Sequence, residues 1–178
     1  MYYNQKTNTY YILLGNKEIL VYPDERLQRI SQPVIEVNNE VRSFISDLEE
    51  TLNIHPGCVG IAAPQVGRLE RIIIVDVSSR PHHKNHGHLV LINPVIRFEE
   101  GKVVGREGCL SVPDYTGKVC RAKKIEVTAQ DELGSHVIYK MVGYEARVLQ
   151  HEIDHLDGNL FLNRLVGKRI DLRQKIGF

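Results

Sequence analysis

Residues 144–158 read YEARVLQHEIDHLDG, and the predictions of fold and of site both start from this stretch. It has the apolar periodicity of an α-helix. The apolar side chains that fall on one face of that helix are Val148, Leu149, Ile153 and Leu156. Residues four apart on a helix lie on the same face, about 6 Å apart along the axis. The stretch therefore predicts a helix that presents His151 and His155 side by side, with Glu152 next to the first of them.

The two histidines have the spacing of ligands for one metal ion. Two imidazoles on one helix face can meet a single cation, and a glutamate beside the first can reach a water at that cation. The simpler interpretation is a pair of helix histidines that only make hydrogen bonds; the predicted helix favours the metal site over it. A catalytic metal site also needs a third protein ligand and an open position.

The third ligand must come from upstream of this helix. A metzincin pattern would continue to a third histidine, but Phe161 stands at that position. A thermolysin-like site would use a downstream glutamate, but no glutamate follows Glu152. The best upstream candidate is Cys109, in the stretch REGCLSVP at 106–113. Its glycine neighbour leaves the sulfur uncrowded and leaves the Leu110 N–H free to point into the site.

A third stretch, GIAAPQVG at 60–67, has the composition of a tight turn. Its small residues allow close approach of another backbone. Gln65 offers a neutral amide donor that can stabilise an oxyanion. Taken alone, the stretch is interpreted as a turn and nothing more.

The remainder of the chain predicts one more helix and several strands. An amphipathic helix is predicted between Asn38 and Leu52, with Asn38 as its N-cap. Short β-rich runs bounded by Gly, Pro and Asn are predicted at 71–77, 89–98, 118–130 and 136–142. Residues 78–88, with four histidines, are interpreted as a solvated loop. The predicted fold is α+β, with short antiparallel β-sheets packed around a central helix that carries the histidine pair.

Composition excludes several classes of protein. The 178 residues suit one domain, predicted at 18–164, with an N-terminal extension at 1–17 and a short basic tail at 165–178. A net charge of +1 argues against specific nucleic-acid binding, and no apolar run reaches the roughly 20 residues that span a bilayer. Three cysteines are an odd number and predict a reducing compartment, the cytoplasm.

Three stretches together resemble the signatures of the peptide deformylase family. They are GIAAPQ at 60–65, EGCLS at 107–111 and QHEIDH at 150–155, in that order and at matching separations. The similarity extends over about residues 19–164. This resemblance implies hydrolytic removal of the N-formyl group from the initiator methionine of nascent polypeptides, with release of formate.

The resemblance also assigns the residues of a metal centre. It implies that Cys109, His151 and His155 bind one divalent metal, Fe(II) above all, with Zn, Ni or Co as replacements. Glu152 would act as general base toward water and then as acid toward the leaving amine. The Gln65 side chain and the Leu110 N–H would donate to the developing oxyanion.

The resemblance further implies a substrate bound as an added strand. Its backbone partners would be Val59, Gly60 and Gly108. The walls of the methionine pocket are expected to be Val59, Leu110, Tyr144 and Val148, with Glu107 nearby. Arg121 and Asp154 are expected to form an ion pair that steadies the metal-binding helix.

Two alternatives stay open, and a departure from the family pattern favours the first of them. Cys58 stands where the first stretch of the family usually begins with glycine. A related metallohydrolase, a peptidase or amidase with another substrate, is the first alternative, and a catalytically silent metal-binding domain used for interaction is the second. The intact Glu152 and Gln65 weigh against the silent domain. A transient ribosome contact through the basic tail is weighed against a simply solvated tail, and no membrane partner is expected.

Overall fold

The two predicted helices are both present in this computed structural model, which describes residues 2–4, 9–11, 17–80, 82–167 and 173–174. Helix α1 spans Asn39–Asn53 and helix α2 spans Gly143–Leu156. The Asn38 side chain caps α1 by accepting a hydrogen bond from the Val41 N–H at 3.0 Å, as the sequence predicts. No helix within the described ranges is long and apolar enough to cross a membrane.

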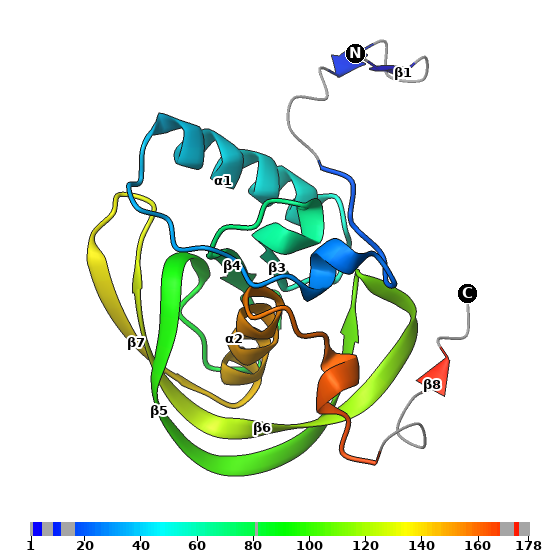
Figure 1. Cartoon of the computed structure of the whole chain (residues 1–178), viewed down its shortest axis with the longest axis vertical. Helices are drawn as coiled ribbons and strands as arrows, with labels where there is room; N and C mark the ends of the chain where they lie inside the picture. Colours follow the sequence, from blue (N-terminus) through cyan, green and yellow to red (C-terminus); the bar gives the residue numbers. More distant parts are fainter. Residues whose placement is uncertain (1, 5–8, 12–16, 81, 168–172, 175–178) are drawn as a thin grey trace.

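One antiparallel sheet forms the body of the molecule (Figure 1). Its strands are paired in the order β3-β4-β5-β6-β7, and β8 pairs with β6. Their bounds are Gly60–Ala62 (β3), Ile72–Asp76 (β4), His88–Cys109 (β5), Val112–Gln130 (β6), His136–Val142 (β7) and Arg173–Gln174 (β8). A separate pair joins β1, Tyr2–Asn4, to β2, Thr9–Tyr11. Single 3-10 turns lie at Glu25–Gln28 (η1), Ala63–Val66 (η2) and Phe161–Arg164 (η3).

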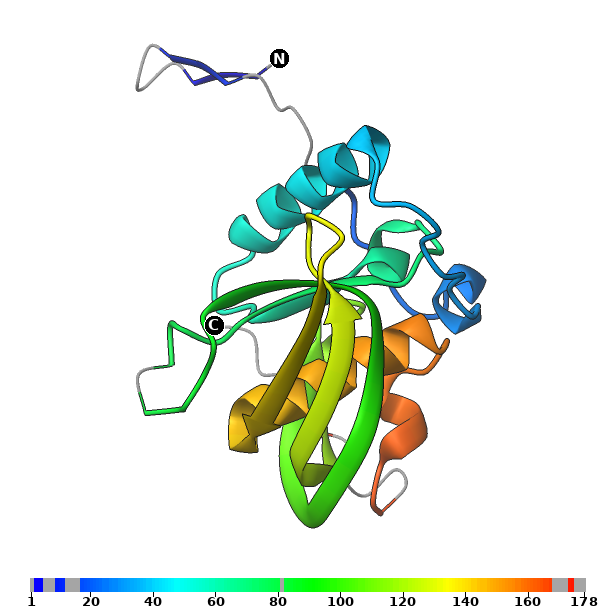
Figure 2. The ribbon, with the colours of Figure 1, turned by 90° about the vertical axis from the view of Figure 1, so that its left-hand side faces the viewer.

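The prediction of short antiparallel sheets is confirmed in part: the strands pair antiparallel, but two of them are long. Strands β5 and β6 run for 22 and 19 residues and form one long curved hairpin, which is clear in Figure 2. The sequence predicted strands only at 89–98 and 118–130. Most side chains at 97–104 are exposed, so this part of β5 lacks the apolar alternation that marks a strand. This part of β5 is a strand because its backbone pairs with β6.

The hydrophobic core is divided between the two faces of the sheet. On β4, Ile72 and Ile74 pack with α1, whereas Ile73 and Val75 pack with α2. Alternate residues of a strand point to opposite faces, so a strand that is buried on both sides reads as one continuous apolar run. All α2 side chains from Glu145 to Leu156 are buried, including the charged ones. The helix with the histidine pair is therefore buried along most of its length.

The predicted division at residues 17 and 164 stays a prediction. The N-terminal extension is described only at β1 and β2 and at its last residue, Lys17. Of the basic tail, Lys168, Arg169 and Lys175 lie outside the described residues, so the structure tests neither the ribosome contact nor the solvated tail weighed against it.

Candidate metal centre

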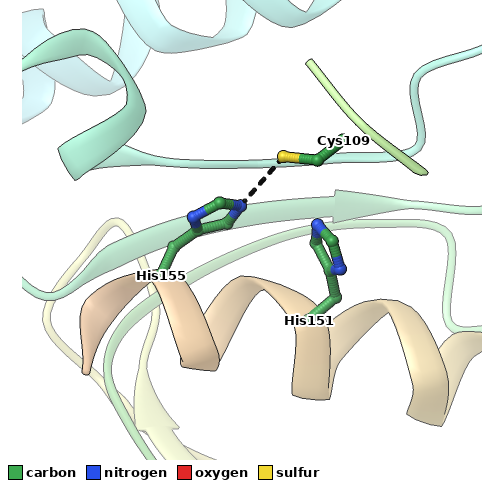
Figure 3. A group of neighbouring side chains, drawn as sticks. All are labelled: Cys109, His151 and His155. Carbon is green, nitrogen blue, oxygen red and sulfur yellow. Dashed lines mark hydrogen bonds between the residues drawn. The ribbon is translucent and has the colours of Figure 1, made fainter. Parts of the chain in front are cut away.

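Three potential metal-ligating side chains converge between the end of β5 and α2 (Figure 3). The candidate ligand atoms of Cys109, His151 and His155 all lie within 4.8 Å of one another, and all three residues are buried. Both rings lie on the side of α2 that faces the thiol, and the Cys109 Sγ is 3.2 Å from the His155 Nε2. The structure thus brings together residues 42 and more positions apart in the chain, as the metal-site hypothesis requires.

Each imidazole has one nitrogen directed to this point. The His151 Nδ1 lies 3.0 Å from Glu107 Oε2, which leaves its Nε2 for a ligand. A carboxylate on the second ring nitrogen is a common arrangement for a metal-binding histidine, because it fixes both the tautomer and the ring orientation. The buried His155 Nδ1 has no hydrogen-bond partner among the described residues.

The charge state of Cys109 suits metal binding. Burial alone would raise the pKa of this thiol, but the neighbouring His155 and His151 hold its pKa well below the usual range. The thiolate is the form that ligates metals. One thiolate and two imidazoles make three protein ligands, which is the number that a catalytic site provides when it keeps one position open. The donor set therefore fits a divalent transition metal.

Glu152 lies beside this cluster in an unusual environment. Its side chain is buried, its Oε2 has no hydrogen-bond partner among the described residues, and burial raises its pKa to about 7. Gly60 on β3 makes room for it, because a Cβ at that position would lie only 2.6 Å from Glu152 Oε1. A carboxyl with these properties is a candidate general base.

Gln65 reaches the same cluster from η2. Its Oε1 accepts a hydrogen bond from the Ala62 N–H at 2.9 Å, which orients the amide. Its Nε2 then donates to Ser111 Oγ at 3.2 Å and to Cys109 Sγ at 3.4 Å. The amide of Gln65 is thus presented to the metal cluster as a donor.

A cleft of about 340 Å³ opens onto these groups. Every residue predicted for the substrate lines it: Val59, Gly60, Glu107, Gly108, Leu110, Tyr144 and Val148. Cys58 also lines the cleft. Its thiol donates to the Gly60 carbonyl at 3.1 Å, and burial raises its pKa to about 11.

Glu107 faces the helix as well as the cleft. Burial would raise the pKa of its carboxyl, but hydrogen bonds from His151 and Arg121 hold that pKa at about 2. Arg121 binds it through two nitrogens, at 3.0 and 2.9 Å. The predicted pair is also formed, because Arg121 Nη1 lies 2.5 Å from Asp154 Oδ2. The carboxylate of Glu107 therefore orients a histidine, a role that the sequence argument did not assign to it.

Two contributors to the site were missed by the sequence argument. Arg147 lines the cleft and donates to Glu107 Oε1 at 2.7 Å; its position four residues before His151 on the predicted helix was a usable signal. The second is the histidine loop: its histidines are exposed, as the sequence predicts for a solvated loop, but the loop also contacts α2. The His86 backbone N–H donates to the buried Glu145 carboxylate at 2.7 Å, and the His83 ring lies 4.9 Å from that of Tyr144. No local pattern predicts this docking.

Comparisons with known proteins point to a single family. A family model described as polypeptide deformylase matches residues 16–170. The chain is 40% identical over 158 residues to a peptide deformylase of Thermodesulfovibrio yellowstonii, covering 89% of this chain and 94% of that one. It is 43% identical over 148 residues to peptide deformylase 3 of Shewanella oneidensis, covering 83% and 88%. The crystal structure of a peptide deformylase from Legionella pneumophila superposes with a TM-score of 0.79 at 37% identity, covering 86% and 88%.

Proposed function

The chain belongs to the polypeptide deformylase family, and we propose that Cys109, His151 and His155 hold the divalent metal on which deformylases depend. The protein is accordingly a deformylase of nascent peptides, a metal-dependent hydrolase that removes the formyl group from N-formylmethionine. The observation that carries the site assignment is the convergence of one low-pKa thiol and two imidazoles within 4.8 Å, next to a buried carboxyl.

The metal proposed for this site is Fe(II), with Zn, Ni or Co as replacements. Imidazole and thiolate ligands suit all of these ions, so the donor set supports the class of metal rather than one element. A divalent cation held there supplies Lewis acidity, which activates water as a nucleophile and polarises the formyl carbonyl. Helix α2, which carries two of the proposed ligands, is buried from Glu145 to Leu156.

Glu152 is the proposed general base and acid. Its Oε2 has no partner among the described residues and can accept the proton of the attacking water. The same carboxyl then returns that proton to the amine that leaves as formate departs. Because the carboxyl is buried, the proton that it holds is shielded from exchange with bulk water between these two steps.

Two donors are proposed for the developing oxyanion. The Gln65 Nε2 is preorganised by the bond that its own Oε1 accepts from Ala62. The Leu110 N–H lies in the turn that joins β5 to β6, directly after Cys109. Donors that are fixed before the reaction need no reorganisation in the transition state, which is why they are effective.

The substrate is proposed to lie along the cleft as an added strand. Val59, Gly60 and Gly108 supply backbone groups at its two sides. The methionine side chain is proposed to occupy the part of the cleft lined by Tyr144 and Val148, which approach it from the first half of α2.

The test is anaerobic purification with metal analysis, followed by a formate-release assay on formyl-Met-Ala-Ser. We expect about one metal per chain in the wild type and in Glu152→Ala, because the carboxyl is not among the three ligands. The variant should lose about 10²-fold to 10⁴-fold in kcat. Glu132→Ala, which removes an exposed carboxylate, is the matched control.

An active Glu152→Ala protein would refute the assignment of the base. A folded and active wild type without metal would refute the metal site. The same peptide without its formyl group separates deformylation from the alternative of a peptidase, because only a peptidase would cleave it.

A further inference from the structure

Arg147 and His151 share one buried carboxylate. They lie one turn apart on α2, so their side chains emerge from the same face. Arg147 Nη1 donates to Glu107 Oε1 at 2.7 Å, and the His151 Nδ1 lies 3.0 Å from the other oxygen, Oε2. A carboxylate that is held at both oxygens by one helix cannot rotate freely. Its orientation, and that of the histidine ring, are therefore linked to Arg147.

The rest of the guanidinium is bound to the hairpin. Arg147 Nη2 donates to the Val103 carbonyl on β5 at 2.8 Å, and Nη1 donates to the Val119 carbonyl on β6 at 3.1 Å. These bonds join α2 to both long strands beside the cleft. Since a planar guanidinium presents its N–H groups in a rigid fork, the carbonyls also fix the direction in which it meets Glu107.

Gly105 is what makes room for this arrangement. A Cβ at position 105 would lie 2.9 Å from both Cζ and Nη2 of Arg147. Any side chain there would push the guanidinium out of its place. Gly105 and Arg147 are thus one structural unit, although the two residues are 42 positions apart.

Charge balance explains why Glu107 needs a second arginine. Arg121 binds Glu107 but also binds Asp154, so its single positive charge is shared between two buried carboxylates. Arg147 pairs with Glu107 at one end of this chain of charges, and Arg164 pairs with Asp154 at the other. A buried carboxylate that loses a partner is strongly destabilised. Without Arg147, the only arginine paired with Glu107 would be Arg121, which Asp154 also shares.

We propose that Arg147 is a positioning residue for the deformylase reaction: it holds Glu107 and thereby orients His151, in a space that Gly105 leaves open. The proposal rests on the proposed function, because His151 acts there as a metal ligand. Arg147 itself does not touch the reacting atoms in this proposal.

The first test compares Arg147→Met with Arg71→Met. Arg71 forms an arginine–carboxylate pair with Asp157, at the far end of α2 and away from the cleft, which makes it a matched control. The Zn(II)-loaded proteins are mixed with a chromogenic chelator, and the rate of metal release is followed together with kcat. Residues behind a metal ligand typically affect metal affinity or activity by about 10-fold to 100-fold. We expect Arg147→Met to release Zn(II) about 10-fold faster with a comparable loss of kcat, and Arg71→Met to match the wild type.

Arg147→Lys and Gly105→Ala provide the second test. Lysine keeps the positive charge and one donor for Glu107 but lacks the forked N–H groups of the guanidinium. Arg147→Lys should therefore release Zn(II) more slowly than Arg147→Met but faster than the wild type. Gly105→Ala keeps Arg147 and should still release Zn(II) faster. The double variant Gly105→Ala/Arg147→Met should release it no faster than Arg147→Met alone, because both changes break the same contact.

Additive effects of these two substitutions would overturn the proposal, as would an Arg147→Met protein that retains Zn(II) and kcat like the wild type. A lower thermal midpoint with unchanged metal release would also overturn it, since that would be a purely structural role. Failure of the proposed function looks different: the wild type itself would then bind no metal or release no formate.

Discussion

Replacement of Gly60 by alanine tests the position of the proposed base with a single methyl group. The added Cβ would lie 2.6 Å from Glu152 Oε1 and 3.0 Å from its Cδ. An ordinary contact is about 3.4 Å or more, so the carboxylate would have to retreat by roughly 0.8 Å. The backbone of Gly60 does not have the positive φ that favours glycine, and alanine is therefore compatible with the strand.

The expected cost follows from that displacement. A misplacement of about 1 Å in a catalytic group can lower the rate about 10²-fold. We therefore expect kcat for formate release to fall roughly 10²-fold in Gly60→Ala, with about one metal per chain retained, because the three proposed ligands do not touch this position.

The assay compares kcat, metal content and the far-UV circular dichroism spectrum of Gly60→Ala with those of the wild type. The control is the same substitution in a Glu152→Gln background, where no base remains to be displaced and a further loss should be small. Wild-type kcat in Gly60→Ala would refute the reasoning. So would an equal additional loss in the Glu152→Gln background, because the methyl would then act on something other than the base.

Three further outcomes are expected. Gln65→Ala should lower kcat about 10²-fold to 10³-fold in the formate assay, since one oxyanion donor is lost; a change of KM alone would contradict this role. Asn93→Ala should destabilise the fold by about 2 kcal/mol in urea unfolding, because Asn93 has a φ of 53° and its side chain bonds both backbone groups of Val34; an unchanged midpoint would contradict it. Cys58, whose pKa burial raises to about 11, is protonated at neutral pH, so its alkylation by iodoacetamide should be slow at pH 7 and rise about tenfold per pH unit. Peptide mapping measures this rate, and a plateau reached by about pH 10 would show that the pKa is not raised.

The helices were predictable because their signals are local. The N-cap at Asn38 and the apolar periodicity of both helices lie within a few residues of each other in the chain. The long hairpin was not predictable to its full length. Residues 99–106 of β5 are held by backbone pairing with β6. Their side chains are largely exposed, so the sequence there has no alternation of apolar residues that would predict a strand.

The candidate site divides in the same way. His151, His155 and Glu152 follow from helical spacing. Cys109 was the best upstream candidate for the third ligand that two histidines still require, and the family resemblance assigned it. The tether of the histidine loop to α2 joins residues 59 positions apart, His86 and Glu145, and no spacing rule links them.

By itself, the sequence determined which side chains are able to do the chemistry. The types of residue that bind metals, and their spacing along a helix, can both be recognised within a short stretch of the chain. Only the tertiary structure decided what surrounds them. It placed Glu107 between Arg121 and Arg147, and it brought Glu152 against Gly60 and Arg147 against Gly105, where the glycines leave room for a carboxylate and a guanidinium. The physical reason is that burial, charge pairing and close approach depend on distances between segments that are far apart in the chain, and such distances exist only once the chain has folded.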